Sequence, residues 1–455
     1  MKNGLTPQRR ARAATRILAA GAALVVTAAL AACSGGSSSG GSSYGFTEAK
    51  QSNSTLTVWV DSTRVAAAKA FEAANPKVKI KIVSYDGSAN GSNSFKTKMQ
   101  LFDRAGKGWP DVVFSSPNND APWASQKTNG KQAFAAVLDH GLVPSATLKG
   151  FASGSLNVCT VNGQVYCLRN DLAQNVFWYD KTLMDQFGYT VPTTWEEYEA
   201  LGVKVAKDHP GYVIGSAGDS FTPEVYFWGS KCQANDITGP KSVTVDTTSS
   251  NCKRAASLLD SGISNGTIST LSLFSPDFVQ KYSGKVLSLV GPSWYGGAVY
   301  NSSTGLNLPA GHLAVAAPLT WGTEDVTTGD VGGGTWFISS HSTNLAAATK
   351  FAQFVTTSDD YQAKLAPTYP AYTTAAKAWV SAQEASGYYV GDLSAMVAAA
   401  PLVWKGWGSG SFSQEAIWAS TMTPKITAGS TVLSLLSTWD NAIKNQAQVE
   451  GYTVK

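Results

Sequence analysis

Several polar side chains lie next to aromatic ones, at places where short apolar runs of the sequence end. Asp61 and Arg64 follow the run Thr55–Val60, which contains Trp59, and two asparagines follow the run Asp111–Phe114. Carboxylates, amides and hydroxyls exchange hydrogen bonds with hydroxyl groups, and a Trp ring offers a large flat apolar surface with few rotors to freeze. This combination suits a sugar, whose ring carries hydroxyls at its edge and weakly apolar C–H groups on its faces.

The candidate ligand-binding residues each follow a predicted strand or lie in a loop. Each also has a structural alternative: Asp61 or Ser62 can cap the next helix, Asp171 can belong to an ion pair, and any of the 14 tryptophans can be packing. The candidates are Trp59, Asp61, Ser62, Arg64, Ser115, Asn118, Asn119, Asp171, Asn175, Glu224, Tyr226, Trp228, Trp294, Tyr295, Trp404 and Trp407.

The sequence contains no strong motif for catalysis, metal binding or polyamine binding. A glycoside hydrolase needs two carboxylates about 5–5.5 Å or 6.5–9.5 Å apart, and no spacing of the candidate acids compels such a pair. There is no Gly-x-Ser-x-Gly elbow and no phosphate loop, and the cysteine and histidine spacings are not those of metal ligands. A polyamine site needs several carboxylates together, and no such group is visible in the sequence. We therefore expect no catalytic centre, metal or cofactor.

Strand and helix patterns alternate between the candidates. Strict period-two alternation at Val78–Val83 and a capping box at Thr194 with Glu197 are the sharpest local signals. We expect strands at 55–60, 78–83, 111–114, 175–179, 286–290 and 313–317, and helices at 64–74, 95–104, 181–187, 196–207, 345–355, 359–365 and 432–448. Such alternation indicates an α/β protein, in which ligands sit beyond the carboxyl ends of strands.

The N-terminus has the pattern of an export signal. Five cations and no acid occur in the first sixteen residues, followed by an apolar run from Ile17 to Ala32 that is short for a membrane span. The sequence Leu30-Ala31-Ala32-Cys33 resembles the bacterial lipobox, whose cysteine is lipidated. We expect a signal peptide at 1–32, then lipidated Cys33 and a flexible Ser/Gly tether through 53.

Four further cysteines are expected to form disulfides in an oxidising compartment. Four cysteines allow three pairings, and we favour the local one, Cys159–Cys167 and Cys232–Cys252. The first pair flanks a predicted hairpin. A three-residue turn at Asn162–Gln164 places Cys159 opposite Cys167, so the longer turn is expected.

The length and net charge of the chain indicate how many domains it has and which partners are unsuited to it. Without residues 1–32 the chain has 30 Lys and Arg (35 − 5) against 31 Asp and Glu, a net charge of −1. That balance argues against a nucleic-acid binder. The remaining 423 residues (455 − 32) are long for one core, so two domains are expected.

The landmarks, taken in order, resemble the extracellular solute-binding proteins of bacterial ABC importers, family 1, the sugar-binding group. They are LTVWVDSTRVAAAKAFEAANPKVKIKI, WPDVVFSSPN, VYCLRNDLAQNVFWYDKTLMDQFGYTVPTTWEEY, LSLVGPSWYGGAVY and GGGTWFISSHSTNLAAATKFAQFVTT. The resemblance implies a two-lobed α/β fold of the periplasmic-binding-protein type II, with three hinge crossovers and a ligand cleft between the lobes.

The resemblance also implies boundaries, roles and partners. Lobe 1 is expected at 54–166 plus 319–369 and lobe 2 at 167–318 plus 370–455. Trp294 is expected to stack on the ligand, and Gly334, Thr335 and Trp336 to approach it where the chain re-enters lobe 1. The implied protein is a monomer anchored to the outer face of the cell membrane, which captures a sugar or oligosaccharide by hinge closure and delivers it to permease subunits. A secreted glycoside-active enzyme or a binder of a non-sugar solute such as a polyamine is the alternative.

Overall fold

A five-stranded mixed sheet organises the first part of the chain. In the computed structural model, residues 54–127 and 132–455 are described. The three strands β2, β1 and β3 are parallel, and β14 then runs antiparallel to both β3 and β6. In sheet order the strands are β2 (Ile80–Ser84), β1 (Leu56–Val60), β3 (Val112–Ser115), β14 (Thr335–Ile338) and β6 (Cys167–Arg169).

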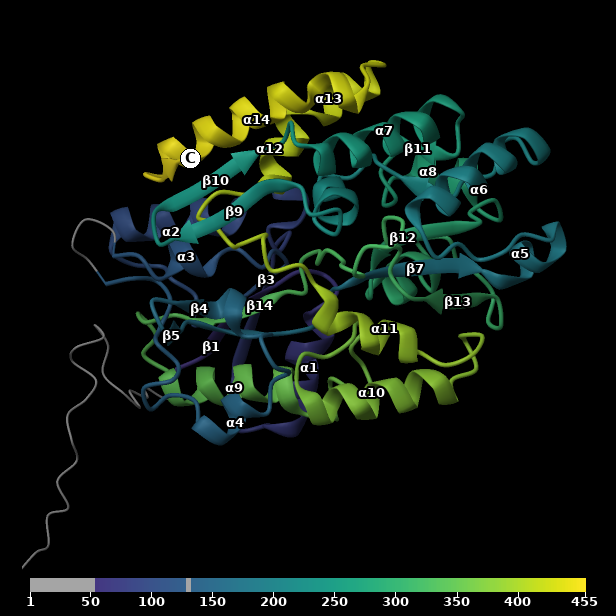
Figure 1. The fold of residues 1–455 in the computed structure, drawn as a ribbon. Helices are drawn as coiled ribbons and strands as arrows, with labels where there is room; N and C mark the ends of the chain where they lie inside the picture. The colour runs from purple at the N-terminus through teal and green to yellow at the C-terminus, as the bar shows by residue number, and fades with distance from the viewer. Residues whose placement is uncertain (1–53, 128–131) are drawn as a thin grey trace, which may run out of the picture. The chain divides into compact units, whose positions relative to one another are not determined.

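Both faces of this sheet are buried, which gives what we call the first core. One face packs on α9 (Leu345–Thr357) and α1 (Val65–Ala74), where the rings of Phe71 and Phe351 meet at 5.0 Å. The other face carries Trp59 and packs against α2 (Ser94–Ala105). Successive side chains of a strand point to opposite faces, so the run around Trp59 is buried on both sides. Figure 1 shows α9 running beside the sheet.

The second core is built around smaller sheets and most of the C-terminal helices. Strand β7 lies between β12 and β13, antiparallel to both, and α14 packs on α7, α12 and β10 (Figure 1). The remaining strands are β4 (Thr160–Val161), β5 (Gln164–Val165), β7 (Asn175–Asp180), β8 (Gly215–Ser216), β9 (Gln233–Gly239), β10 (Ser242–Asp246), β11 (Ile268–Ser269), β12 (Ser288–Pro292), β13 (Leu313–Ala316) and β15 (Thr453–Val454).

The remaining α-helices include several that close the C-terminal part of the chain. They are α3 (Ala121–Ala124), α4 (Ser145–Lys149), α5 (Lys181–Phe187), α6 (Trp195–Asp208), α7 (Ser250–Ser264), α8 (Pro276–Tyr282), α10 (Thr373–Ala385), α11 (Ser394–Ala399), α12 (Gln414–Thr421), α13 (Thr423–Thr427) and α14 (Val432–Val449).

Most predicted elements are confirmed within two residues at each end. The capping box is present: the Thr194 hydroxyl accepts from the Glu197 amide, and the Glu197 carboxylate accepts from the Thr194 amide. The helix expected at 359–365 is wrong. That segment is a turn, closed by a hydrogen bond from the Leu365 amide to the Tyr361 carbonyl.

Both predicted disulfides are present, but the turn inside the first differs from expectation. Val161 pairs with Gln164, so the turn has two residues, and its Asn162 and Gly163 have φ of 50° and 77°. Asn-Gly tolerates this left-handed backbone, which matches the twist of a hairpin. Cys159 lies in a 3₁₀ turn outside the ladder, and so its Cα comes within 5.0 Å of that of Cys167 without the longer turn.

The residues next to the expected lobe boundaries pack differently from the implied division. Leu319 and Trp321 contact the second core, whereas Ala371 and Tyr372 contact the first. The boundaries themselves stay a prediction. The expected signal peptide, Cys33 and the tether lie outside the described residues, and so does their relation to a membrane.

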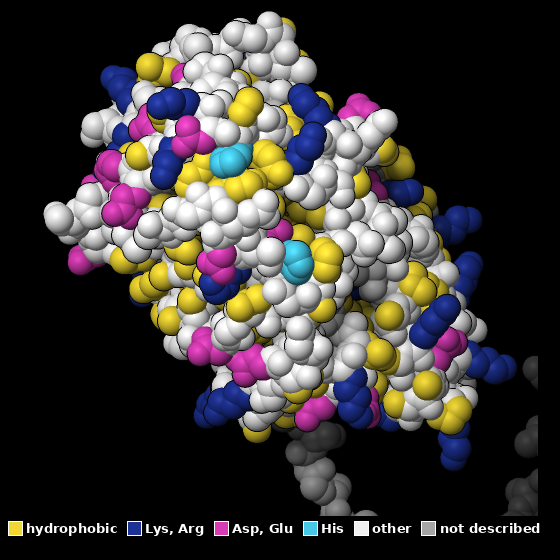
Figure 2. All heavy atoms as spheres, turned by 90° about the vertical axis from the view of Figure 1, so that its right-hand side faces the viewer, with side chains coloured by type: hydrophobic (Ala, Val, Ile, Leu, Met, Phe, Trp, Pro, Cys, Tyr) yellow, Lys and Arg dark blue, Asp and Glu magenta, His cyan; other side chains and the backbone are white. Residues whose placement is uncertain are grey.

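Within the described ranges, the structure contains neither a helix suited to crossing a bilayer nor a group of three or more acidic, His or Cys side chains placed to hold a metal ion. On the face drawn in Figure 2, basic and acidic side chains are both present and interspersed with neutral ones.

Candidate ligand-binding site

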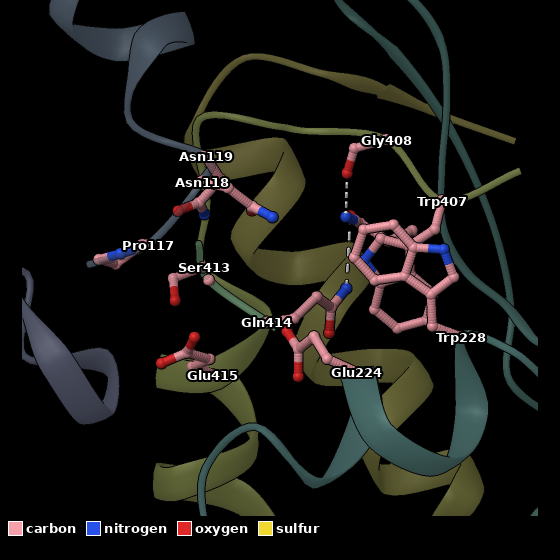
Figure 3. A pocket seen from close by; sticks show the side chains of 12 residues that line it. Pro117, Asn118, Asn119, Glu224, Trp228, Trp407, Gly408, Ser413, Gln414 and Glu415 are labelled. Carbon is pink, nitrogen blue, oxygen red and sulfur yellow. Dashed lines mark hydrogen bonds between the residues drawn. The ribbon is translucent and has the colours of Figure 1, made fainter. Parts of the chain in front are cut away.

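A pocket lies where segments from distant parts of the chain meet. The loop after β3 comes from the first core, while the π-helical turn Pro223–Phe227, the loop at Trp407 and the start of α12 come from the second. Figure 3 shows their side chains converging. The lining residues are Pro117, Asn118, Asn119, Glu224, Trp228, Asn235, Gly332, Trp407, Gly408, Ser413, Gln414 and Glu415.

Strand direction brings the polar loop of the first core to this pocket. β1 and β3 are parallel neighbours, so the loops after both strands leave the same edge of the sheet. Asn118 donates to the Asp330 carboxylate at 3.1 Å, and Asn119 donates to the Phe412 carbonyl at 3.0 Å. These two bonds fix the loop against segments that reach it from far along the sequence.

Two tryptophans form an aromatic wall on the side of the second core. The rings of Trp228 and Trp407 stack with centroids 5.2 Å apart and planes 11° from parallel, and both side chains are nearly buried. Trp228 donates its ring N–H to the Trp404 carbonyl at 2.8 Å, which fixes the orientation of the indole. A rigid pair of this kind offers an apolar surface at little further entropy cost.

Amide side chains around the pocket are oriented by backbone carbonyls. Asn235 donates to the Gly408 carbonyl at 2.5 Å and Gln414 to the Ala234 carbonyl at 2.9 Å. A carbonyl oxygen only accepts, so each of these contacts must be made by the amide nitrogen. The oxygen Oε1 of Gln414 is buried and has no donor among the residues that the structure describes.

Two carboxyl groups lie on the same side of the pocket. In Figure 3, Glu224 and Glu415 both lie in the lower half of the view, below Asn118 and Asn119. Glu224 is 8% exposed, and its Oε2 has no hydrogen-bond partner. Burial, followed by repulsion from Glu415, raises the pKa of Glu224 well above its usual range. Burial raises the pKa of Glu415 to about 7.

The walls of the pocket are close together. The space between them is about 20 Å³, enough for about one water molecule and too small for a sugar ring. Nearby, the two cores also touch directly: Lys96 on α2 pairs with Glu450 at 2.6 Å, and Gly91 packs on the backbone of Ala416. Admitting a sugar-sized ligand therefore requires the two cores to separate at this seam.

The structure brings together five of the predicted site residues. They come from three separate stretches of sequence and line one pocket. These residues are Asn118, Asn119, Glu224, Trp228 and Trp407.

Three charged candidates form an ion network that does not line this pocket. Arg64 lies 3.3 Å from the Asp61 carboxylate and 3.8 Å from that of Asp171, and its guanidinium is 4.4 Å from the centre of the Phe114 ring. Asp61 also accepts from the Arg64 amide at 2.8 Å, in the turn before α1, but it does not cap the helix, whose N-cap residue is Arg64. The ion pair considered as the structural alternative for Asp171 is present.

Other candidates are buried away from the pocket. Trp336 is fully buried in the first core, where its ring N–H donates to the Asn170 side chain at 2.9 Å. Adjacency to a polar residue in the sequence does not place a side chain at the pocket, because alternate residues of these strands face apolar cores. The buried candidates outside the pocket are Trp59, Ser115, Asp171, Asn175, Tyr226, Tyr295, Thr335 and Trp336.

The predicted stacking residue Trp294 does not line the pocket. Its ring N–H donates to the Val331 carbonyl at 2.9 Å, and the ring packs on Phe221 and Phe274. Trp404 contributes its carbonyl to Trp228 rather than its ring to the lining, and Ser62 is exposed at the start of α1.

The glycines before β14 lie close to neighbouring parts of the protein. Gly332, Gly333 and Gly334 all have φ between +52° and +83°. A Cβ at Gly333 would lie 2.3 Å from the Arg169 guanidinium, and one at Gly334 would lie 2.5 Å from the Phe114 ring. The close approach predicted here is to neighbouring side chains, and only Gly332 reaches the pocket.

Sequence reasoning missed seven of the twelve lining residues. Asn235 follows the second disulfide's Cys232 in β9, and Ser413 caps α12 by accepting from the Ala416 amide at 3.1 Å. The cap pattern was a usable signal for a helix start beside the Trp407 loop. No spacing in the sequence indicates that Gln414 and Glu415 meet Glu224, which lies far away along the chain.

Comparisons with known proteins agree on one family. The model of the family described as bacterial extracellular solute-binding protein matches residues 55–362, more than half of the chain. A search of curated proteins gave no match.

Solved structures with the same fold include sugar-binding proteins, and two of the three described below belong to an ABC transporter by their descriptions. One is the binding protein of Bifidobacterium animalis subsp. lactis Bl-04 with β-1,6-galactobiose (TM-score 0.70, 18% identity, 88% of this chain and 99% of that one). Another is the galacto-N-biose/lacto-N-biose I-binding protein of Bifidobacterium longum (0.69, 19%, 88% and 99%). A third is the cyclic α-maltosyl-1,6-maltose-binding protein of Arthrobacter globiformis (0.64, 17%, 87% and 99%). At these identities the likeness concerns the fold, and it confirms the predicted two-lobed α/β class.

Proposed function

The chain belongs to the bacterial extracellular solute-binding proteins, and we propose that it binds a sugar or oligosaccharide and delivers it to the permease of an ABC importer. The observation that carries this proposal is the pocket itself. A rigid Trp228–Trp407 pair stands beside the amides of Asn118 and Asn119 and the carboxyl of Glu224. A sugar needs that pairing of an apolar plane with hydrogen-bonding groups.

Capture by hinge closure follows from where the lining residues come from. The Asn118–Asn119 loop belongs to the first core and the tryptophans to the second, so neither core holds a complete site. A ligand that contacts both has greater affinity for the closed arrangement and shifts the population toward it. The closed form is then the state a permease can distinguish from the open one.

The cellular setting of the proposal rests on the sequence. Residues 1–32 are proposed as a signal peptide and Cys33 as the lipidated first residue of the mature protein, tethered through residue 53. The lobes are proposed near 54–166 with 319–369, and 167–318 with 370–455, and the protein as a monomer on the outer face of the cell membrane.

Binding without turnover is part of the proposal. The relatives by family and fold are binding proteins rather than enzymes. The rival hypothesis is a hydrolase that uses Glu224 and Glu415 as its carboxylate pair. Recovering the bound sugar after incubation separates the two, because a hydrolase returns shorter products.

The test is a glycan array on the purified protein, followed by thermal unfolding with each hit. Bound ligand stabilises the fold by RT ln(1 + [L]/Kd), about 2.7 kcal/mol at one hundred times Kd. We expect saturable stabilisation by one sugar class and full chromatographic recovery of that sugar unchanged. Stabilisation by no glycan, or recovery of cleaved sugar, would overturn the proposal.

A further inference from the structure

The pocket combines two carboxyl groups with no cation in its lining. Glu224 and Glu415 contribute two carboxyl groups, and no Lys or Arg is among the lining residues. The Oε2 atom of Glu224, on a side chain more than nine-tenths buried, has no donor among the described residues. A buried carboxylate that has neither a hydrogen-bond donor nor a cation beside it is energetically costly. A ligand that supplies a donor or a cation would reduce that cost.

Two further acidic side chains lie near Glu415. Asp219, which is buried, and Asp120 lie close enough to raise the pKa of Glu415 by repulsion. Asp219 is held by the Leu273 amide at 3.1 Å and by the Ser272 hydroxyl. Asp120 accepts from the Trp123 ring N–H at 2.6 Å. The positive charge of Lys96 acts on Asp120 and lowers the pKa of its carboxyl group.

Cations that contact segments beside the pocket already have carboxylate partners. Lys96 is paired with Glu450 at 2.6 Å, and Arg169 with Asp330 at 2.9 Å. Arg64 lies between Asp61 and Asp171. None of these cations is therefore available to neutralise the Glu224–Glu415 pair.

The side-chain amides of the pocket use their nitrogen atoms as donors to the protein, which leaves their oxygen atoms as acceptors for a ligand. Asn119, Asn235 and Gln414 each direct a nitrogen at a backbone carbonyl. The Gln414 Oε1 atom, like Glu224 Oε2, is buried without a donor. A ligand that matches this wall must bring hydrogen-bond donors, and preferably positive charge.

A neutral sugar supplies donors but leaves the paired carboxyls without a countercharge, whereas an ammonium group supplies three donors and the charge together. We propose, on the basis of the proposed function, that the preferred ligand is a sugar carrying a protonated amine, whose ammonium group lies between Glu224 and Glu415 while its ring contacts Trp228 and Trp407. Spermidine and other open-chain polyamines match the charge but not the aromatic wall.

The test measures binding by calorimetry with three sets of probes at pH 7.5. They are glucosamine, galactosamine and glucosamine oligosaccharides; the N-acetyl and hydroxyl counterparts of each; and spermidine. We expect the amine form of at least one sugar to bind ten times more tightly than both counterparts. Lowering the pH to 5 protonates the carboxyls and should weaken amine binding while leaving neutral sugars unchanged or tighter.

Variants identify the groups responsible. Glu224→Gln and Glu415→Gln should each reduce the ratio of affinities between the amine sugar and its neutral counterparts to below threefold. Neither variant should lose binding of the neutral sugars. Glu199→Gln, the same charge change at an exposed position on α6, should keep it. Equal or tighter binding of N-acetyl or hydroxyl sugars by the unmodified protein would overturn the inference and leave sugar binding intact. Binding of spermidine alone, or of no probe, would overturn the proposed function with it.

Discussion

Gly91 offers a test of closure that leaves the pocket residues untouched. It lies in the 3₁₀ turn Ala89–Gly91 after β2 with φ of +71°, and a Cβ there would stand 2.7 Å from the amide nitrogen of Ala416 and 2.8 Å from its Cα. Ala416 belongs to α12, the helix that begins with Gln414 and Glu415. Gly91→Ala therefore places a methyl group in the seam between the two cores.

The expected magnitude has two parts. An L-residue in the left-handed region costs about 1–2 kcal/mol, and this lowers the free energy of unfolding whether the seam is open or closed. Overpacking a tight contact costs about 1–3 kcal/mol, and this falls on the closed form alone because only that form makes the contact. Since ligand binds the closed form, Kd should rise about 5- to 150-fold.

Gly106→Ala is the matched control. Gly106 ends α2 with φ of +67°, and nothing lies within 4 Å of a Cβ placed there. The control carries the same backbone strain without the methyl group in the seam. Urea unfolding measures the shared loss of stability, and calorimetry with the sugar identified on the array measures affinity.

The two variants should lose similar stability, and only Gly91→Ala should lose affinity. X-ray scattering with saturating ligand should also show a larger radius of gyration for Gly91→Ala than for Gly106→Ala. If Gly91→Ala binds as tightly as Gly106→Ala, the seam at Ala416 does not form when ligand binds, and the closure argument fails.

Three further outcomes are expected. Trp407→Ala should weaken sugar binding about 5- to 30-fold by removing about 1–2 kcal/mol of stacking, whereas Trp294→Ala, outside the pocket, should change calorimetric affinity less than twofold; the reverse order would move the site. Replacing Cys232 and Cys252 together by Ala should lower the free energy of unfolding by about 3 kcal/mol, from a sequence separation of 20, and an unchanged urea midpoint would contradict this. Burial raises the pKa of Asp219 to about 6, so the folded chain binds this proton more tightly, and the stability contribution falls as pH rises from about 4 through 6, by up to about 3 kcal/mol. Asp219→Asn should lose that part of the urea-measured pH slope, and an identical slope would refute the assignment.

The fold could be predicted because its signals are local. The alternation at Val78–Val83 and the capping box at Thr194 each depend on a few neighbouring residues, and both elements are present. The turn at 359–365 shows the limit. Its apolar spacing resembles a helix, and the Ala363 and Leu365 amides do bond to carbonyls four residues earlier, but the segment remains a turn and does not extend into a helix.

The site could be predicted only in part because it depends on contacts between distant segments. Asn118 and Trp228 stand next to recognisable elements, so their loops could be identified. Trp336 satisfied the same rule and lies in the core, because sequence does not reveal which face of a strand is covered. The approach of Glu415 to Glu224 depends on tertiary packing alone, and so the carboxyl pair was invisible in the sequence.

The most direct test of the whole account is a crystal structure of the protein with the sugar that stabilises it most. The account predicts density for the sugar ring against Trp228 and Trp407, with Asn118 or Asn119 reaching it from the opposite core. Sugar bound at Trp294, or held by residues of a single core, would contradict it.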